Sequence, residues 1–342
     1  MTSVLFVRLS AMGDVVQGLG AVAALHRVRP DWELVFVTQS AFAPLLQGFP
    51  GLASVVRFGR GDGLGGVLAL RRALRGRTFD HVLDLQGNWK SAMVARLAPA
   101  KQRLGMARQW RQEQLSRLLL TRTIDCDAVP HPARAAYELV RAIAPDAPFL
   151  LPQLRATGVE VANEHHALAA IGIDVSRPFT VVVVTAPTDP RALRPERIAE
   201  LVARSTQPVL QLLGPAEATL AMPTPSLVLR HARGELRRLV ALGAIIAANG
   251  GSVIGPDQGA SHVLAAAGAR CEVLFGAQDP RRSGPPGATA RIHPVPPSCS
   301  PCRRRTCDHA QGVVCMNFPL DGGCAVGLGL PAEADPSSPR AG

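Results

Sequence analysis

The stretch VRLSAMGDVV, residues 7–16, places a carboxylate where an apolar, strand-like segment changes into a helical pattern. Gly13 allows a tight turn here, and an acid in the first turn of a helix is stabilised by free backbone N–H groups and by the helix dipole. Asp14 can therefore be a simple helix cap. A carboxylate fixed at the mouth of a ligand site can also take a proton from an acceptor hydroxyl, so general-base catalysis is the second interpretation.

A second group of candidates lies in the sequence IGPDQGASHVLAAAG. It places Asp257, Gly259 and His262 at the start of an Ala-rich helical pattern that follows an apolar run. Backbone N–H groups at such a helix start can hold a diphosphate, with His262 one turn inside. A lone helical histidine is more often a buried structural residue, but this grouping favours a ligand site. Glu217, in LLGPAEATL, follows another strand-like run, where an acid can bond ribose hydroxyls.

Four cysteines near the C-terminal end have the spacing of metal ligands. Cys299, Cys302, Cys307 and Cys315 follow the pattern C-x2-C-x4-C-x7-C, and Cys324 lies nearby. In a cytoplasmic protein such clustering favours a metal over disulfides. Four thiolates can form a closed tetrahedral zinc site, which would be structural because no position is left for substrate. An iron–sulfur cluster would use the same ligands, and reduced thiols in a loop are the remaining alternative.

The elements that must position these residues follow from an alternation of short apolar runs with amphipathic helical patterns. Strand-like runs begin at residues 4, 33, 54 and 81; after a Pro- and Ala-rich passage they resume at 179, 208, 227, 244 (AIIAANGG) and 271. This alternation predicts two α/β units, each a parallel sheet flanked by helices. Ligands bind at the carboxyl ends of strands in such sheets, so two facing sheets predict one interdomain cleft.

The residues from Gly18 to Ala23, GLGAVA, match the dinucleotide-binding fingerprint G-x-G-x-x-A. The match begins several residues inside the predicted helix instead of opening it, and no acid ends the second strand. We therefore expect these glycines to make helix-packing contacts.

Composition and charge restrict the classes of function. The 342 residues suit two domains, and the 47% hydrophobic content is that of a soluble globular protein. The net charge of +11 favours an anionic partner, such as nucleotide phosphates, nucleic acid or an acidic membrane surface. A single Tyr, three Trp and no recognised motif argue against nucleic acid.

The basic excess gathers between Lys90 and Arg122, where eight basic residues accompany Glu113 alone among acids. This stretch is either a solvated face or a surface that meets the acceptor and an acidic membrane. No secretory signal is readable, and the longest uncharged stretch is too short and too interrupted for a membrane span. The expected location is the cytoplasm, with peripheral contact on the cytoplasmic face of the inner membrane.

Five segments, in this order, resemble glycosyltransferase family 9, the ADP-heptose:lipopolysaccharide heptosyltransferases: RLSAMGDVVQGLGAVAAL, FDHVLDLQGNWKSA, GPAE, GPDQGASHVLAAAG and LFGAQDPRRSGP. The resemblance covers nearly the whole chain up to about residue 320. It implies a GT-B fold, an α/β architecture of two Rossmann-like domains facing an interdomain cleft. The expected parts are an acceptor-binding domain (1–160), a nucleotide-sugar-binding domain (161–325) that contains a Cys-rich segment (299–324), and a flexible tail (326–342).

The resemblance also implies roles for individual residues. Asp14 would deprotonate the acceptor sugar hydroxyl for inverting attack on the anomeric carbon, which needs no metal or other cofactor in this fold. The implied donor-binding residues are Glu217, Asp257, Gln258, Gly259 and His262. The implied acceptor-binding residues are Gly13, Gln86, Gly87 and Lys90, the last of them meeting anionic core sugar or lipid phosphates.

The sequence departs from the family pattern where a lysine normally neutralises the leaving nucleotide diphosphate. Relatives often read Lys-x-Trp-Pro, whereas Ala192 takes the Lys position here and Arg194 the Trp position. Because a leaving diphosphate needs a cation more than a particular side chain, Arg191 or Arg194 is expected to supply it. Gln17 replaces a common His and Gln258 a Thr or Ser, which leaves the exact sugar open.

The sequence thus predicts an inverting, metal-independent glycosyltransferase that moves heptose from ADP-heptose to the inner core of a lipid A–core acceptor. One alternative is a family 9 enzyme with another nucleotide sugar or acceptor. The other is a non-catalytic sugar-nucleotide or glycan-binding relative, for which the missing lysine at position 192 is the best evidence.

Overall fold

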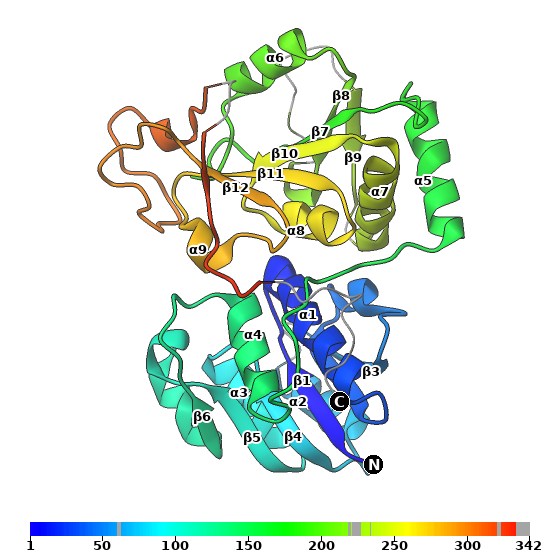
Figure 1. Cartoon of the computed structure of the whole chain (residues 1–342), viewed down its shortest axis with the longest axis vertical. Helices are drawn as coiled ribbons and strands as arrows, with labels where there is room; N and C mark the ends of the chain where they lie inside the picture. The colour runs from blue at the N-terminus through cyan, green and yellow to red at the C-terminus, as the bar shows by residue number, and fades with distance from the viewer. Residues whose placement is uncertain (60–62, 218–219, 221–226, 233, 320–322, 333–342) are drawn as a thin grey trace. The chain divides into compact units, whose positions relative to one another are not determined.

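The computed structural model describes residues 1–332 except 60–62, 218–219, 221–226, 233 and 320–322. Its contacts divide the chain into two compact units. One holds Met1–Pro152 with the described part of Gly329–Gly342, and the other holds Gln153–Leu328. Each unit has its own sheet (Figure 1). Among the described residues, no helix combines the length and the apolar character that a membrane crossing needs.

The first unit contains a six-stranded parallel sheet in the order β3-β2-β1-β4-β5-β6. Its strands are β1 (Ser3–Val7), β2 (Glu33–Gln39), β3 (Leu52–Phe58), β4 (Phe79–Asp84), β5 (Ala100–Met106) and β6 (Arg122–Ile124). Its helices are α1 (Met12–Val28), α2 (Gly63–Ala73), α3 (Trp89–Leu97) and α4 (Pro132–Arg141), with short 3-10 helices η1 (Ala43–Leu46), η2 (Arg108–Trp110) and η3 (Gln114–Leu119).

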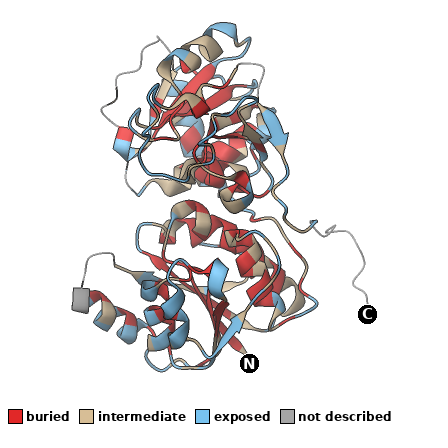
Figure 2. Cartoon of the chain, turned by 90° about the vertical axis from the view of Figure 1, so that its left-hand side faces the viewer, coloured by how far each residue is buried: buried red, intermediate tan, exposed pale blue. Residues whose placement is uncertain are grey.

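Different helices cover the two faces of this sheet. Helices α1 and α4 pack side by side on one face (Figure 1). On the other face, Leu70 of α2, Leu74 of the turn after it and Val94 of α3 join a core that includes Leu5 and Val7 of β1. Burial on both faces explains why the central strands are continuous apolar runs, and Figure 2 shows buried residues along them.

The second unit contains a seven-stranded sheet in the order β13-β12-β11-β10-β7-β8-β9. Its strands are β7 (Thr180–Val183), β8 (Val209–Leu213), β9 (Leu227–Arg230), β10 (Ser252–Pro256), β11 (Arg270–Phe275), β12 (Thr289–Ile292) and β13 (Cys324–Val326). Its helices are α5 (Gly158–Ala170), α6 (Pro195–Arg204), α7 (Leu236–Asn249), α8 (Gly259–Ala266) and α9 (Pro280–Ser283), with 3-10 helices η4 (Pro215–Glu217) and η5 (Val314–Met316). Counted from β7, its parallel strands repeat the order of the first unit, and β13 adds an antiparallel edge.

The expectation of a strand at AIIAANGG is wrong. These residues form the end of α7, which stops at the left-handed Gly250 (φ 76°), and the strand β10 begins only at Ser252. Leu239, Leu242 and Ile246 are all buried on this helix. Their helical spacing outweighs the strand-like look of the two adjacent isoleucines.

The C-terminal end differs in part from the expected tail. Val326, the first residue of that tail, pairs with Ala290 in the antiparallel ladder between β12 and β13. Residues 333–342 of the tail lie outside the described residues.

The expectation that Gly18 and Gly20 make packing contacts is confirmed. A Cβ atom on Gly20 would lie 2.2 Å from the backbone oxygen of Leu150, and one on Gly18 would lie 3.2 Å from Cδ1 of Leu85. The helix α1 can therefore approach both segments closely only because it has no side chains at these two positions.

A fully buried ion pair fixes the loop that follows β4. Arg111 donates to Oδ2 of Asp84 at 2.8 Å, and the side chains of both residues are inaccessible to solvent. Oδ1 of Asp84 accepts hydrogen bonds from the backbone N–H groups of Gln86 and Gly87, both at 3.1 Å. The expectation that the basic stretch faces outward is therefore wrong for Arg111, whose guanidinium pairs with Asp84 in the interior of the unit.

Breaking this pair should cost far more than breaking an exposed one. We expect Arg111→Met to lower the free energy of unfolding by about 3–5 kcal/mol, because Asp84 is left as an uncompensated buried charge. Lys101→Met is the control: Lys101 pairs with Asp80 at 2.7 Å but is 72% exposed, so the loss should stay below about 1 kcal/mol. Urea denaturation of both variants tests this, and equal losses would contradict the assigned role of the buried pair.

Candidate functional site

The strand order of the first unit defines where a ligand can bind. Strand β1 pairs with β2 on one side and with β4 on the other, so the connections that leave β1 and β4 run in different directions. In open parallel sheets this divergence leaves a crevice at the carboxyl ends of the strands. Asp14 follows β1, and the segment of Gln86 and Gly87 follows β4, so these predicted residues flank this crevice.

The carboxylate of Asp14 is anchored through one oxygen. Oδ2 accepts from the guanidinium of Arg8 and, at 3.2 Å, from the backbone N–H of Ala11 at the start of α1. The Ala11 contact is a helix cap, as the simpler interpretation expects. In the part of the chain that the structure describes, Oδ1 makes no hydrogen bond, and the Asp14 side chain is 27% exposed. One oxygen is thus fixed while the other is available to a ligand.

Gln86 ties the two loops at this crevice together. Its Oε1 accepts from the backbone N–H groups of Leu9 at 2.8 Å and of Ser10 at 3.2 Å. Gly87 adopts a left-handed conformation (φ 76°), and its carbonyl accepts from the N–H of Gln112 at 3.0 Å. The segment is therefore held from several sides and presents a rigid edge to a ligand.

A pocket of about 740 Å³ lies beside this edge, lined in part by Gln86 and Lys90. Trp89 and Met93, which are 41% and 52% exposed, form part of its apolar lining. Gly13 lies buried in the first turn of α1. A pocket that combines an exposed indole, amide groups and a cation can bind the apolar faces, the hydroxyls and the charges of an anionic sugar.

The second unit repeats the arrangement, because β7 pairs with both β8 and β10. Here Asp257 follows β10 and His262 lies on α8. Nε2 of His262 lies 2.9 Å from Oδ1 of Asp257, and the hydroxyl of Ser283 donates to Oδ2 at 2.7 Å. Both carboxylate oxygens are therefore engaged, in contrast to those of Asp14. Gln258, directly before Gly259 at the N-terminus of α8, donates to the hydroxyl of Thr185.

Arg191 bonds both the backbone of Asp257 and the carboxylate of Asp189. Its Nη1 donates to the backbone oxygen of Asp257 at 2.8 Å, while Nε and Nη2 donate to Asp189 at 2.9 and 2.6 Å. The hydrogen bond to Asp189 raises the pKa of Arg191 against the effect of burial, and the charges of Asp189, Asp257 and Glu217 raise it further. Burial acts to raise the pKa of Asp189, but the bonds from Arg191 lower it overall. The group is thus a fixed cation among acids.

The two candidate cations are in different surroundings. Arg194 precedes α6 and donates to the backbone oxygen of Gln311 at 3.0 Å, whereas Arg191 contacts Asp257 itself. Ala192, at the family's lysine position, is buried. Glu217 is buried after β8, where its Oε1 accepts from the N–H of Ala186 at 3.4 Å.

The four predicted metal ligands lie in one region of the second unit. Cys299, Cys302 and Cys307 line a pocket of about 560 Å³. Burial raises the pKa of the Cys315 thiol to about 11, and the three other cysteines add to this rise through their charges. Among the described residues, no three His, Cys, Asp or Glu side chains are arranged to hold a metal ion. The zinc site therefore stays a prediction.

Three residues that complete these sites were not among the candidates named from the sequence. Arg8 and Ser283 contact the two candidate aspartates, and Asp189 holds Arg191. Arg8 and Ser283 lie inside two of the quoted family segments, but their contacts depend on the fold: Ser283, for example, is 26 residues from its partner Asp257.

Comparison with known proteins places the chain among glycosyltransferases. The family model described as glycosyltransferase family 9 (heptosyltransferase) matches residues 67–311. The lipopolysaccharide core heptosyltransferase OpsX of Haemophilus influenzae is 22% identical over 293 residues, which cover 83% of this chain and 81% of OpsX.

Solved structures show the same fold. A glycosyl transferase family 9 protein of Veillonella parvula matches with a TM-score of 0.75 and 15% identity, over 92% of this chain and 93% of its own. The E. coli heptosyltransferase WaaC, solved with ADP-2-deoxy-2-fluoro heptose, matches with a TM-score of 0.67 and 21% identity, over 86% of this chain and 94% of its own. The predicted family and GT-B fold are confirmed, and the chain belongs to glycosyltransferase family 9 and is a glycosyltransferase.

Proposed function

We propose that this glycosyltransferase transfers heptose from ADP-heptose to the inner core of a lipopolysaccharide acceptor, with inversion and without a metal in the reaction. The relative OpsX is a lipopolysaccharide core heptosyltransferase, and WaaC was solved with an ADP-heptose analogue. These two relatives support the donor and the acceptor class. The enzyme would work in the cytoplasm, at the cytoplasmic face of the inner membrane.

The observation that carries the mechanism is the difference between the two candidate aspartates. Among the described residues, Asp14 is bonded only through Oδ2, whereas Asp257 uses one oxygen with His262 and the other with Ser283. A general base needs an unoccupied oxygen within reach of the proton that it removes. We therefore assign the base to Asp14, with Arg8 as the residue that positions it.

The proposed step is a single displacement. Oδ1 of Asp14 takes the proton of the acceptor hydroxyl while the hydroxyl oxygen forms a bond to the anomeric carbon of the donor. The bond from this carbon to the diphosphate oxygen breaks on the opposite face, and ADP leaves with the bonding electrons. Arg191 supplies positive charge toward the leaving diphosphate in place of the absent lysine. Glu217 binds the ribose, and the N-terminus of α8 with Gln258, Gly259 and His262 holds the diphosphate.

The acceptor is proposed to occupy the 740 Å³ pocket of the first unit. Gln86 and Gly87 form its rigid edge, and Lys90 contributes a charge to it. The exposed Trp89 is suited to stack on a sugar ring.

Removing the basicity of Asp14 tests this assignment. Asp14→Asn keeps the size of the side chain and its ability to cap α1, so the variant should fold and bind donor. We expect sugar transfer to slow at least about a hundredfold, the usual loss for a general base. Asp31→Asn, the same charge change at an exposed position of the first unit, is the control. Near-normal transfer by Asp14→Asn would show that the base is another group.

The two candidate cations can be separated in the same assay. Arg191→Ala should lower kcat about a hundredfold or more, as removal of a charge-stabilising donor does, because Arg191 is the cation at Asp257. Arg194→Ala removes a contact to Gln311 and should change kcat less than about threefold. Similar losses in the two variants would argue against assigning the leaving group to Arg191.

We also propose a structural zinc ion held by Cys299, Cys302, Cys307 and Cys315. The donor set suits the proposal because four thiolates are a common ligand set for structural zinc. The ion would fasten the Cys-rich segment and take no part in sugar transfer.

Elemental analysis of protein purified without added metal checks this proposal. We expect about one zinc per chain, lost in Cys302→Ser/Cys307→Ser and retained in Cys126→Ser, which alters a cysteine outside the cluster. Iron in the same ratio would indicate a different metal on these ligands. If the protein contains neither zinc nor iron, the four cysteines are reduced thiols and the proposal is wrong.

A further inference from the structure

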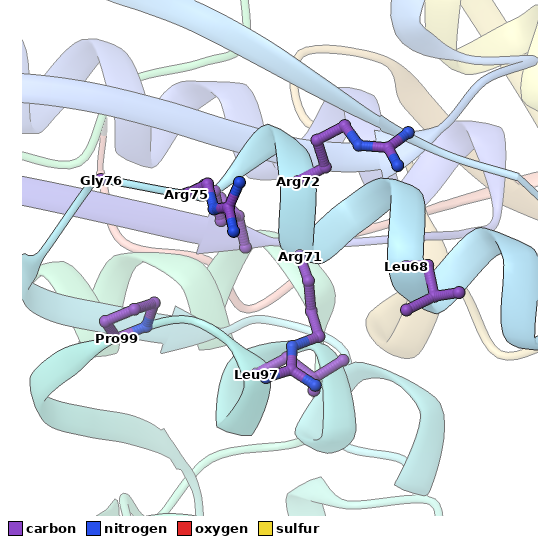
Figure 3. A pocket seen from close by; sticks show the side chains of 8 residues that line it. Leu68, Arg71, Arg72, Arg75, Gly76, Leu97 and Pro99 are labelled. Atoms are coloured by element: carbon purple, nitrogen blue, oxygen red, sulfur yellow. The ribbon is translucent and has the colours of Figure 1, made fainter.

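A second pocket of the first unit lies between α2 with its following turn and the end of α3, and it has no role in the proposed reaction. Its volume is about 520 Å³. Figure 3 shows the side chains that line it, which come from α2, the turn after it and the end of α3. They are Leu68, Arg71, Arg72, Leu74, Arg75, Gly76, Leu97 and Pro99. None of these described lining residues is acidic.

Three arginines, Arg71, Arg72 and Arg75, give this pocket a positive charge. Arg71 lies in the last turn of α2 and Arg75 in the turn that follows this helix, and both line the pocket. Both are exposed, and the structure gives neither an ion pair with any described residue. In Figure 3 the side chain of Arg71 extends toward Leu97, while that of Arg72 extends the other way. An anionic group over the pocket would therefore meet positive charge with no acidic side chain among these lining residues.

Large apolar side chains are exposed in this pocket and on the neighbouring elements α3 and η3. Leu68 of α2 is 61% exposed, and Met93 of α3 is 52% exposed. Leu115 and Leu118, on the 3-10 helix η3 that packs against α3, are exposed at 63% and 71%. Cations beside exposed leucine and methionine are typical of surfaces that lie in a lipid headgroup region, because both kinds of side chain then find suitable surroundings.

We propose that the outer face of α2 and α3 docks on an anionic bilayer, with a lipid headgroup phosphate seated between Arg71 and Arg75. A soluble phosphate would account for the arginines but not for the exposed apolar residues beside them. The inference extends the proposed function, whose acceptor is itself a membrane lipid. Leu97 lines both this pocket and the 740 Å³ pocket that contains Gln86 and Lys90, so a docked bilayer would lie next to the proposed acceptor pocket.

Vesicle binding by charge-matched variants tests the docking surface. Wild-type protein should sediment with vesicles of phosphatidylglycerol and phosphatidylcholine, bind pure phosphatidylcholine vesicles much more weakly, and lose binding as salt rises. Arg71→Gln/Arg75→Gln should partition about thirtyfold less, since each arginine near an anionic surface contributes about a fivefold preference. Arg204→Gln/Arg270→Gln removes two exposed charges from the second unit and should bind like wild type.

A second variant tests the apolar part of the surface. Leu68→Gln keeps every charge, and because Leu68 is exposed it should fold normally. It should bind the anionic vesicles several-fold less tightly than wild type. Unchanged binding by both Leu68→Gln and Arg71→Gln/Arg75→Gln would overturn the proposal, and so would equal losses in Arg71→Gln/Arg75→Gln and in the second-unit control.

Glycerol 3-phosphate distinguishes a lipid from a soluble phosphate ligand. At millimolar concentration it should not release the protein from vesicles; release that depends on Arg71 and Arg75 would assign the pocket to a soluble phosphate instead. Failure of docking and failure of the proposed function are separable. Arg71→Gln/Arg75→Gln should glycosylate a deacylated, water-soluble acceptor at the wild-type rate and an acceptor embedded in vesicles more slowly. If wild type transfers no sugar to either acceptor, the proposed function fails while vesicle binding still decides the docking surface.

Discussion

The pairing of the first strand with both the second and the fourth strand is the constraint on which each unit depends. It occurs at β1 in one sheet and at β7 in the other. In both sheets, the connections that leave the first and the fourth strand run in different directions. The loops and helix starts that follow these strands can therefore carry polar groups without disturbing the buried sheet. The candidate catalytic and binding residues lie at these points: Asp14 and Gln86 in the first unit, and Arg191 and Asp257 in the second.

What distinguishes the residues at these points is how their hydrogen-bonding capacity is used. Asp257 shares its two oxygens between His262 and Ser283, and its backbone oxygen accepts from Arg191. Such a carboxylate is well suited to orient its neighbours, because both of its oxygens already take part in contacts. In Asp14, Arg8 donates to Oδ2, while Oδ1 makes no hydrogen bond with the described residues. The same residue type thus serves two purposes, because its partners differ.

Much of this could be predicted from the sequence because it depends on local patterns. Asp14 and Asp257 each stand between an apolar run and a helical pattern, and the runs that became β1, β2, β4, β7, β8 and β11 are short, apolar and bounded by polar residues. The remainder depends on contacts between distant residues. Nothing local distinguishes the buried Arg111 from its exposed basic neighbours, since its burial follows from Asp84, 27 residues earlier. The Ala- and Ile-rich end of α7 likewise needed its buried partners to be recognised as helix.

The proposed mechanism is a direct displacement at the anomeric carbon, with a protein carboxylate as the base and no metal in the reaction. The configuration of the newly formed glycosidic bond tests it most directly. Purified protein is incubated with ADP-heptose, a lipopolysaccharide acceptor that lacks heptose, and a chelator in excess, and the anomeric configuration of the product is determined by NMR. The account predicts transfer with the configuration opposite to that of the donor. Retention of the donor's configuration, or transfer abolished by the chelator and restored by a divalent cation, would contradict it.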